Sequence, residues 1–319
     1  MELGVKNAEG NVEIKAKKNM LERMKKQKAL IIMSIPFVIY TLIFSYAPLL
    51  GWVMAFQKYK PGKALFDQTW VGLTQFKTLF ADPVFLGVIR NTLCMSIINL
   101  TLGTICSIGF ALLLNEVRRL LAKKFIQTIS YLPHFLSWII VTGIVVDVLA
   151  TDTGVINQVL VALHIISEPI NFFAETKYFW GIVGLTNVWK EVGWGSIIYL
   201  AAITGINPDL YEAAEIDGAG RIKKILYVTL PGIKSTIFIL LIMNIGNIVN
   251  AGFELQYLLG NGLIQSVSQT IDIFVLRYGI SLSNYSLATA AGIFKSVVSI
   301  ALIFIANEFA KRAGEERLF

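Results

Sequence analysis

The sequence predicts an all-α membrane protein with six transmembrane helices, both termini in the cytoplasm, and a short cytoplasmic helix between the fourth and fifth spans. Composition is the first observation: of 319 residues, 55% are hydrophobic and 15% are charged, whereas soluble globular domains have about 25% charged residues. The second is a set of six apolar stretches, each long enough to cross a bilayer as a helix. The third is that most Lys and Arg residues outside these stretches fall on the same side of the membrane in the resulting topology.

The apolar stretches define the elements in chain order. They cover residues 29–56, 88–115, 125–150, 178–206, 232–252 and 284–308. The first stretch is too long for a cleaved signal peptide and has no small-residue cleavage site after it, so we expect it to remain as a span. Pro36, Pro48 and Pro133 interrupt two of the stretches, which spans tolerate because neighbouring helices satisfy the freed carbonyl groups.

The chain is accordingly divided into four parts. These are a basic cytoplasmic segment (1–28), the first span with an external loop (29–87), a core domain holding spans two to six (88–310), and a cytoplasmic tail (311–319). Within the core domain, residues 207–231 form the loop between the fourth and fifth spans.

The distribution of positive charge gives the orientation. Lys and Arg outside the spans number 18 on the side of the termini and 6 on the other side. The positive-inside rule therefore places both termini in the cytoplasm. This topology accounts for the net charge of +7, and no run of basic residues interleaved with aromatic rings suggests base stacking. A nucleic-acid partner is not expected.

Several kinds of chemistry have no support in the sequence. Cys94 and Cys106 lie in one predicted helix about 18 Å apart, which is beyond disulfide reach. The phosphate-binding pattern GxxxxGK[ST] does not occur, so any ATP must bind to another chain. Paired carboxylates, His clusters and activated nucleophiles are not apparent. We assign no catalytic residue, no metal site and no cofactor to this chain.

The loop between the fourth and fifth spans holds a short helix. Asn207 is a good N-cap, and Pro208 suits the first helical position. Apolar residues recur at helical spacing until Gly218 and Gly220, where glycine permits a chain reversal. A second short helical pattern follows, and neither could cross a membrane. On these grounds the loop is either a connector lying on lipid headgroups or a surface that another protein approaches closely.

The pattern of this loop resembles the EAA loop of ABC importer permeases: Glu-Ala-Ala, three residues, Gly, nine residues, Ile, any residue, Leu-Pro. The chain has EAAEIDG, nine residues and then VTLP, with Val228 in place of the usual isoleucine. The resemblance implies that residues 212–218 dock as a coupling helix in a groove of a cytoplasmic ATPase. The expected coupling residues are Glu212, Ala213, Ala214, Asp217 and Gly218.

Further motifs are similar to those of carbohydrate-type permeases, in the branch for polysaccharide or aldouronate oligosaccharides. They are Gly51-Trp52, Trp70-Val71-Gly72-Leu73, Tyr131-Leu132-Pro133 and Ala288-Thr289-Ala290-Ala291-Gly292. The resemblance implies an assembly in the bacterial cytoplasmic membrane. Its other parts are a second permease subunit, usually a different chain, two ATPase subunits that bind ATP and Mg²⁺, and an external solute-binding protein that delivers an oligosaccharide.

Polar residues inside the spans are candidates for a sugar path, because a charge within a span costs at least about 2.5 kcal/mol. They combine hydrogen-bonding groups with an aromatic ring that could stack on a sugar, and their positions resemble those of the sugar site in maltose-type permeases. The candidates are Asn187, Lys190, Glu191, Trp194, Asn244 and Asn247. The alternative is that these groups bond between helices or to the partner permease.

Lys190 and Glu191 point about 100° apart on a helix, so we do not expect them to form a simple ion pair with each other. Lys190 is instead expected to favour uronic-acid sugars. His134 is isolated, and an interhelical hydrogen bond is favoured over a metal or proton role. Lys295 and Asp147 either snorkel, pair across the dimer or line the path.

An importer subunit is the leading hypothesis. The alternative is an ion- or proton-coupled carrier that works without an ATPase, with Lys190, Glu191 and Lys295 as relay groups. The intact coupling loop and the lack of visible inverted repeats argue against a carrier. A membrane anchor would not explain the polar residues in the spans.

Overall fold

The computed structural model describes residues 26–246 and 248–312, most of which are helical. The chain divides into two units, Met1–Val53 and Met54–Phe319. Each unit is described by itself.

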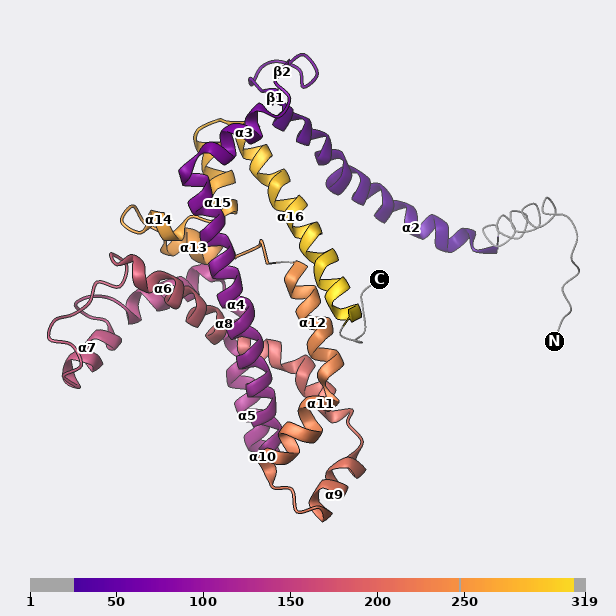
Figure 1. The fold of residues 1–319 in the computed structure, drawn as a ribbon, viewed down its shortest axis with the longest axis vertical. Coiled ribbons are helices and arrows are strands. Elements are labelled where there is room, and N and C mark those ends of the chain that lie inside the picture. Colours follow the sequence, from indigo (N-terminus) through magenta and orange to yellow (C-terminus); the bar gives the residue numbers. More distant parts are fainter. Residues whose placement is uncertain (1–25, 247, 313–319) are drawn as a thin grey trace, which may run out of the picture. The chain divides into compact units, whose positions relative to one another are not determined.

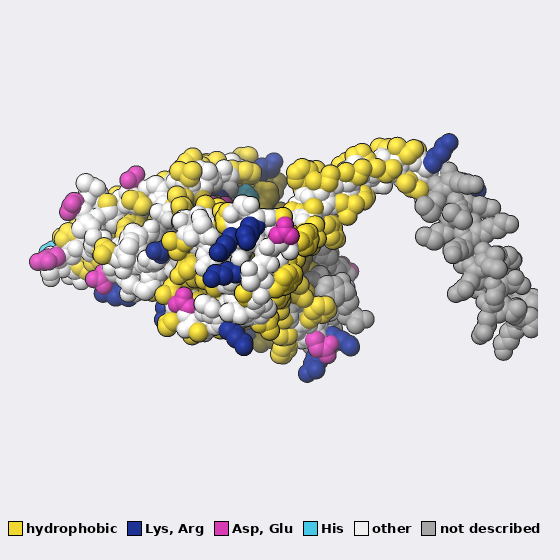
Figure 2. Space-filling model, turned by 90° about the horizontal axis from the view of Figure 1, so that it is seen from above, with side chains coloured by type: hydrophobic (Ala, Val, Ile, Leu, Met, Phe, Trp, Pro, Cys, Tyr) yellow, Lys and Arg dark blue, Asp and Glu magenta, His cyan; other side chains and the backbone are white. Residues whose placement is uncertain are grey.

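The first unit contains the expected first span. α2 (Lys28–Thr41) continues into η1 (Leu42–Tyr46) and η2 (Ala47–Phe56), and Pro36 lies inside α2. Lys28–Phe56 is long and apolar enough to cross a membrane. No residue of α2 or η1 is buried, and hydrophobic side chains cover the visible side of this helix (Figure 2). A helix that is apolar all round and has no protein cover needs lipid or a partner chain around it.

The second unit is built on three long helices, α4 (Pro83–Glu116), α8 (Thr176–Thr204) and α16 (Tyr285–Arg312). They correspond to the predicted second, fourth and sixth spans. α4 and α8 make the most extensive helix pair in the chain. Cys94 and Cys106 are both free thiols on α4, as expected.

The predicted third span is not continuous. α5 (Leu120–Tyr131) runs into the short η3 (Leu132–Phe135), and α6 (Trp138–Val148) then leaves at an angle of 103°. Pro133 cannot donate a backbone hydrogen bond, which weakens the helix here. Ser137 then starts the new helix, because its Oγ accepts a hydrogen bond from the Ile140 N–H at 3.4 Å. The expectation that a helix would continue through Pro133 was wrong.

The predicted fifth span is also bent and is shorter than expected. α10 (Arg221–Lys224), η4 (Ile225–Thr229) and α11 (Leu230–Gly232) form one helical piece. α12 (Lys234–Gly246) follows at 59° to it. The prediction placed the start at residue 232 and the end at 252, but the helix ends at Gly246. Among the described residues, three helices satisfy the criteria for a membrane span, or five if each bent pair is one span.

The remaining elements are short. They are β1 (Gln57–Lys58) paired antiparallel with β2 (Thr69–Trp70), α3 (Thr74–Ala81), α7 (Val155–Ala162), α9 (Pro208–Ile216), α13 (Glu254–Leu259), α14 (Gln265–Ser268), α15 (Ile271–Leu276) and η5 (Arg277–Ser281). The two-stranded hairpin was not predicted, because each strand is only two residues long. Within the second unit, β1, β2 and α3 lie at one end of α4, and α9 and α10 lie at the other (Figure 1).

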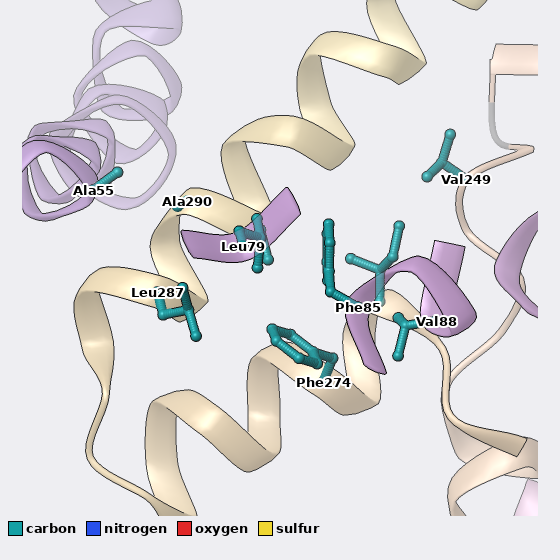
Figure 3. Close-up of a cluster of buried hydrophobic side chains, with 10 residues drawn as sticks. Ala55, Leu79, Phe85, Val88, Val249, Phe274, Leu287 and Ala290 are labelled. Carbon is teal, nitrogen blue, oxygen red and sulfur yellow. The ribbon is translucent and has the colours of Figure 1, made fainter. Parts of the chain in front are cut away.

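A hydrophobic core holds the first of these ends together. Leu79, Phe85, Phe274 and Leu287, from α3, α4, α15 and α16, are almost fully buried in one cluster. Figure 3 shows Phe85 and Phe274 beside each other at the centre of this cluster, and their ring centroids are 5.1 Å apart. Burying a large apolar side chain stabilises a fold by about 1.5–3 kcal/mol in water, and aromatic pairs add to this through ring geometry.

Candidate functional site

The loop between α8 and α12 contains α9, whose two ends are fixed by local interactions. At its start, Asn207 Oδ1 accepts a hydrogen bond from the Asp209 N–H at 3.0 Å, and Pro208 occupies the first turn. At its end, Gly218 has a φ of +74°, and the Ala219 N–H donates to the Ala214 carbonyl at 2.8 Å. This is a left-handed helix termination of the kind that glycine favours. The predicted N-cap, first-turn proline and glycine reversal are all present.

Side-chain contacts hold α9 against the helical piece that follows it. Tyr211 Oη lies 3.0 Å from Thr229 Oγ1, and the Thr229 side chain is buried. Lys224 Nζ forms an ion pair with Glu215 Oε1. The Lys224 hydrogen bond and charge, with a smaller contribution from Arg118, hold the pKa of the Glu215 carboxyl below its usual range. These contacts let α9 move together with the helical piece formed by α10, η4 and α11.

The outer face of α9 carries the predicted coupling residues. Glu212, Ala213, Asp217 and Gly218 are exposed, and Ala214 is half-buried. Large apolar side chains surround them: Ile216 is 87% exposed and Ile222 is 73% exposed. α9 lies at the end of the second unit opposite β1 and β2 (Figure 1). Exposed apolar side chains beside charged ones are typical of a surface that binds another protein.

Contacts also tie the loop to the long helices. Tyr199 and Ile203, near the end of α8, pack with Ala111 on α4 and with Ile233, which lies just before α12. Arg221 Nε at the start of α10 lies 4.0 Å from Glu116 Oε2 at the end of α4. A force on α9 would therefore reach α4, α8 and α12 through packed side chains rather than through a flexible linker.

A second group of polar residues lies where the broken third span meets α8. His134 Nδ1 is 2.7 Å from Glu191 Oε2, and the His134 ring stacks parallel on Trp194 with centroids 4.4 Å apart. Phe135 meets the same Trp194 ring edge-on at 5.6 Å. The interhelical hydrogen bond expected of His134 is therefore present. Trp194 is 45% exposed, so this group presents an aromatic face and a carboxylate to the surface.

Lys190 is the buried member of this group. It is only 4% exposed, and its Nζ donates to the carbonyl groups of His134 at 2.6 Å and of Pro133 at 3.4 Å. Lys190 Nζ also lies 3.4 Å from Glu191 Oε1 and 5.0 Å from the centre of the Trp138 ring. The expectation that Lys190 and Glu191 would not pair was wrong, because both side chains are long enough to bridge the angle between them.

The structure does not gather all the predicted path residues in one place. Asn187 donates to the Val183 carbonyl of its own helix at 2.9 Å. Asn244 instead lines a separate polar cavity of about 230 Å³ between α4 and α12, together with Ser96, Asn99 and Asn250. Asn247 lies outside the described residues. Lys295 is paired within the chain to Asp272 Oδ1 at 2.5 Å, and Asp147 is exposed.

Three residues beside the candidate path were not identified from the sequence. Ser96 and Asn99 on α4 line the cavity beside Asn244, and their Oγ and Oδ1 atoms are buried with no hydrogen-bond partner in the part of the chain that the structure describes. The spacing of Ser96, Asn99 and Gly103 along one helix face was the available signal. Trp138 was missed because the break in the third span, which brings it over Lys190, was not foreseen. No group of three possible metal ligands occurs within residues 26–246 and 248–312.

Comparison with known proteins gives consistent matches. Residues 99–314 match the family model for "Binding-protein-dependent transport system inner membrane component". The chain is 43% identical to the Bacillus subtilis "Polygalacturonan/rhamnogalacturonan transport system permease protein YteP", over 95% of this chain and 94% of that protein. It is also 43% identical to the Bacillus subtilis "Protein LplB", over 93% and 92% of the two chains.

A solved structure agrees with the sequence matches. A chain of a bacterial ABC transporter involved in the import of the acidic polysaccharide alginate superimposes with a TM-score of 0.84. It has 39% sequence identity, and the match covers 92% of this chain and 99% of that one. The chain therefore belongs to the family of binding-protein-dependent transport system inner membrane components, and it is a membrane-embedded permease subunit of an ABC importer rather than an enzyme.

Proposed function

We propose that this chain is the permease subunit of an importer that moves uronic-acid-containing oligosaccharides into the cytoplasm. The observation that carries the proposal is α9, an exposed helix that bears the Glu-Ala-Ala and Gly residues of a coupling loop and is fixed at both ends. The substrate class is supported by the relatives: one is named as a polygalacturonan/rhamnogalacturonan permease, and a solved structure concerns alginate import.

The topology proposed for this function has six spans with both termini in the cytoplasm. The apolar helix Lys28–Phe56, α4 and α16 supply three of these spans, and the two bent helix pairs supply up to two more. α8, which has 29 residues and carries Lys190 and Glu191, would be the remaining one. The positive-inside rule then places α9 in the cytoplasm and the β1–β2 hairpin outside.

Coupling would run from α9 to the spans. The proposed partner surface is a groove on an ATPase subunit, which would receive Glu212, Ala213, Ala214, Asp217 and Gly218. The Glu215–Lys224 contact ties α9 to α10, and the Tyr211–Thr229 contact ties it to η4. Two ATPase subunits, a second permease chain and an external binding protein would complete the assembly. The binding protein is supported by the alginate transporter structure, which was solved with an "alginate pentasaccharide-bound periplasmic protein". ATP and Mg²⁺ would bind to the ATPase chains.

The sugar path would use two polar surfaces. Trp194 and Glu191 offer a stacking face and a hydrogen-bond acceptor, and the cavity beside Asn244 offers hydroxyl and amide groups. Asn187 and Asn247 remain proposed members of the path. Lys190 would act through Glu191 and the η3 carbonyls, because its ammonium group is buried against them.

The test is the ATPase activity of the reconstituted complex with its binding protein, measured over a panel of neutral and uronic-acid oligosaccharides. Wild type should be stimulated most by the acidic class. Glu212→Ala should reduce this stimulation while the complex stays assembled, since it alters only the exposed face of α9. The matched control is Glu168→Ala, another exposed carboxylate outside the loop. Uptake by the permease without any ATPase would instead support a secondary carrier and overturn the proposal.

A further inference from the structure

Two neighbouring polar cavities lie on the part of the second unit away from α9. One, of about 510 Å³, is lined by the first turns of α4 and by α14. The other, of about 180 Å³, lies among α13, α14 and the start of η5. Gln265 and Gln269 form part of the wall of both. Neither cavity includes any of the coupling or path residues named above.

The two cavities contain positive charge and no negative charge. Arg90 lines the larger one and Arg277 lines the smaller one, and none of the described Asp or Glu residues lines either. Arg90 Nη2 donates to the Ser266 carbonyl at 3.2 Å and to Asn91 Oδ1 at 3.1 Å, which fixes the guanidinium but neutralises none of its charge. The carboxylate of Asp272, five residues before Arg277 in the sequence, is paired with Lys295. An arginine without a carboxylate partner is well suited to bind a carboxylate in two parallel hydrogen bonds.

Two buried amide groups in the cavity walls each have one atom without a hydrogen-bond partner among the described residues. Gln269 is 4% exposed, and its Nε2 has no hydrogen-bond partner among the described residues. Gln256, in the smaller cavity, is 1% exposed and its Oε1 is likewise unpaired. A buried polar atom left unpaired costs about 1–3 kcal/mol. Such atoms therefore indicate a place where a polar ligand completes the hydrogen bonding.

The remaining wall groups suit a sugar. Ser268 adds a hydroxyl group for sugar hydroxyls, and the Asn261 amide is held in place by bonds to the Phe173 carbonyl and the Leu263 N–H. The half-exposed Tyr257 ring stacks on Phe253 at 5.2 Å and has a second face for a sugar. A site for a simple inorganic anion would not need an aromatic ring. The combination of two arginines, several amides and one ring instead matches a sugar that carries a carboxylate.

We infer that Arg90, Arg277 and Gln269 form a binding subsite for the carboxylate groups of an acidic oligosaccharide at the external mouth of the permease. The inference rests on the proposed function for its substrate class and for the external position of these cavities. The subsite receives the sugar as it leaves the binding protein, before the sugar reaches Trp194 or the cavity beside Asn244.

The test uses the complete reconstituted complex in vesicles, its binding protein and a labelled tetragalacturonate. Arg277→Gln is the decisive variant, because the Arg277 side chain has no partner within the described part of the chain. It should lower uptake about tenfold at a fixed concentration of loaded binding protein, as expected for loss of a charge-assisted contact. Gln269→Leu should lower uptake without changing any charge, and Arg277→Lys should restore part of the loss. Lys77→Gln, which removes an exposed positive charge from α3 outside both cavities, should have no effect.

Other outcomes identify other occupants and overturn the inference. An increase in the half-saturating concentration of binding protein, with maximal uptake unchanged, would mean that Arg277 docks an acidic surface of that protein. A loss that disappears in vesicles without anionic lipid would point to a phosphate headgroup. Unchanged uptake in both the Arg277→Gln and Gln269→Leu variants would leave no role for the cavities. If wild type takes up no carbohydrate at all, it is the proposed function that fails.

Discussion

The contact between α5 and α8 at Gly193 offers a sharp test of the structure. A Cβ atom built on Gly193 would lie 2.0 Å from the carbonyl oxygen of Ser130 and 2.5 Å from its carbonyl carbon. Both atoms belong to backbone, so no side-chain rotation could relieve the overlap. Gly181, in the same helix, has nothing within 4 Å of the corresponding position. The two variants Gly193→Ala and Gly181→Ala therefore make the same chemical change in the same helix with different consequences.

The expected magnitudes follow from two opposing effects. Replacing glycine by alanine inside a helix stabilises it by up to about 1 kcal/mol. At Gly193 the helices must also separate by about 1.4 Å before ordinary contact is reached, and overpacking of this kind typically costs about 1–3 kcal/mol. We expect Gly193→Ala to be destabilised by about 1–2 kcal/mol relative to wild type. Gly181→Ala should be neutral or slightly stabilised.

The functional consequence of Gly193→Ala should be larger than the loss of stability. Gly193 lies next to Trp194, which stacks on His134 across the same contact. Separating α5 and η3 from α8 would also lengthen the 2.7 Å contact between His134 and Glu191. Sugar-stimulated ATPase activity should therefore fall in Gly193→Ala and be retained in Gly181→Ala.

The assay is thermal unfolding of the purified complex in detergent, with the variants heated at one rate, followed by ATPase measurement. Gly109→Ala, an open position on α4, serves as a second control for the effect of alanine. Equal melting temperatures for Gly193→Ala and Gly181→Ala would refute the close approach of α5 to α8.

Three further predictions concern the loop and one ion pair. Gly218→Ala should reduce sugar-stimulated ATPase activity several-fold, because alanine at a φ of +74° costs about 1 kcal/mol; Gly220→Ala, at a φ of −69°, should not. Lys224→Met should raise the pKa of Glu215 toward its usual range, which NMR of a selectively labelled complex would detect. The pKa of Glu215 is lowered in the folded protein. The ion pair therefore stabilises the loop at pH values above the usual carboxyl range, and this stabilisation is lost as the pH falls through the lowered pKa. Lys224→Met should abolish this loss of stability in acid, and an unchanged dependence of stability on pH would contradict the role of the Glu215–Lys224 pair. Lys295→Met should destabilise the contact of α15 with α16 by about 2 kcal/mol, between the values for exposed and buried pairs. Adding Asp272→Asn should recover part of the loss in a melting experiment, and additive losses would show that the pair does not interact.

Local chemistry made the coupling loop predictable. Asn207, Pro208 and Gly218 each act on the backbone within a few residues of themselves, so their effects can be deduced without knowing the fold. The long spans were predictable for a related reason, since hydropathy over about 20 residues depends on composition alone. The match of the loop to the Glu-Ala-Ala pattern indicated the family, which local physics could not supply.

The polar residues were less predictable because their roles depend on partners far away in the chain. A helical projection places Lys190 on one stripe with Trp194, yet the structure buries one and exposes the other. The deciding factor is the break after Pro133, which turns the η3 carbonyl groups toward Lys190. Helical periodicity identifies a face of α8, and only the packing of η3 against that face decides which side chains remain accessible.

The same packing suggests how movement of α9 would alter the proposed sugar surface at Trp194 and Glu191. Tyr199 and Ile203 join α8 to the loop, and Trp194 lies five residues before Tyr199 on the same rigid helix. His134, in contrast, is carried by the bend between α5 and α6. A displacement of α8 relative to that bend must change the stacking of Trp194 on His134 and the contact of Glu191 with His134. Movement of the loop and exposure of the Trp194 ring are thus linked through α8. Gly193 permits the close contact between α8 and α5 at which such a displacement would occur.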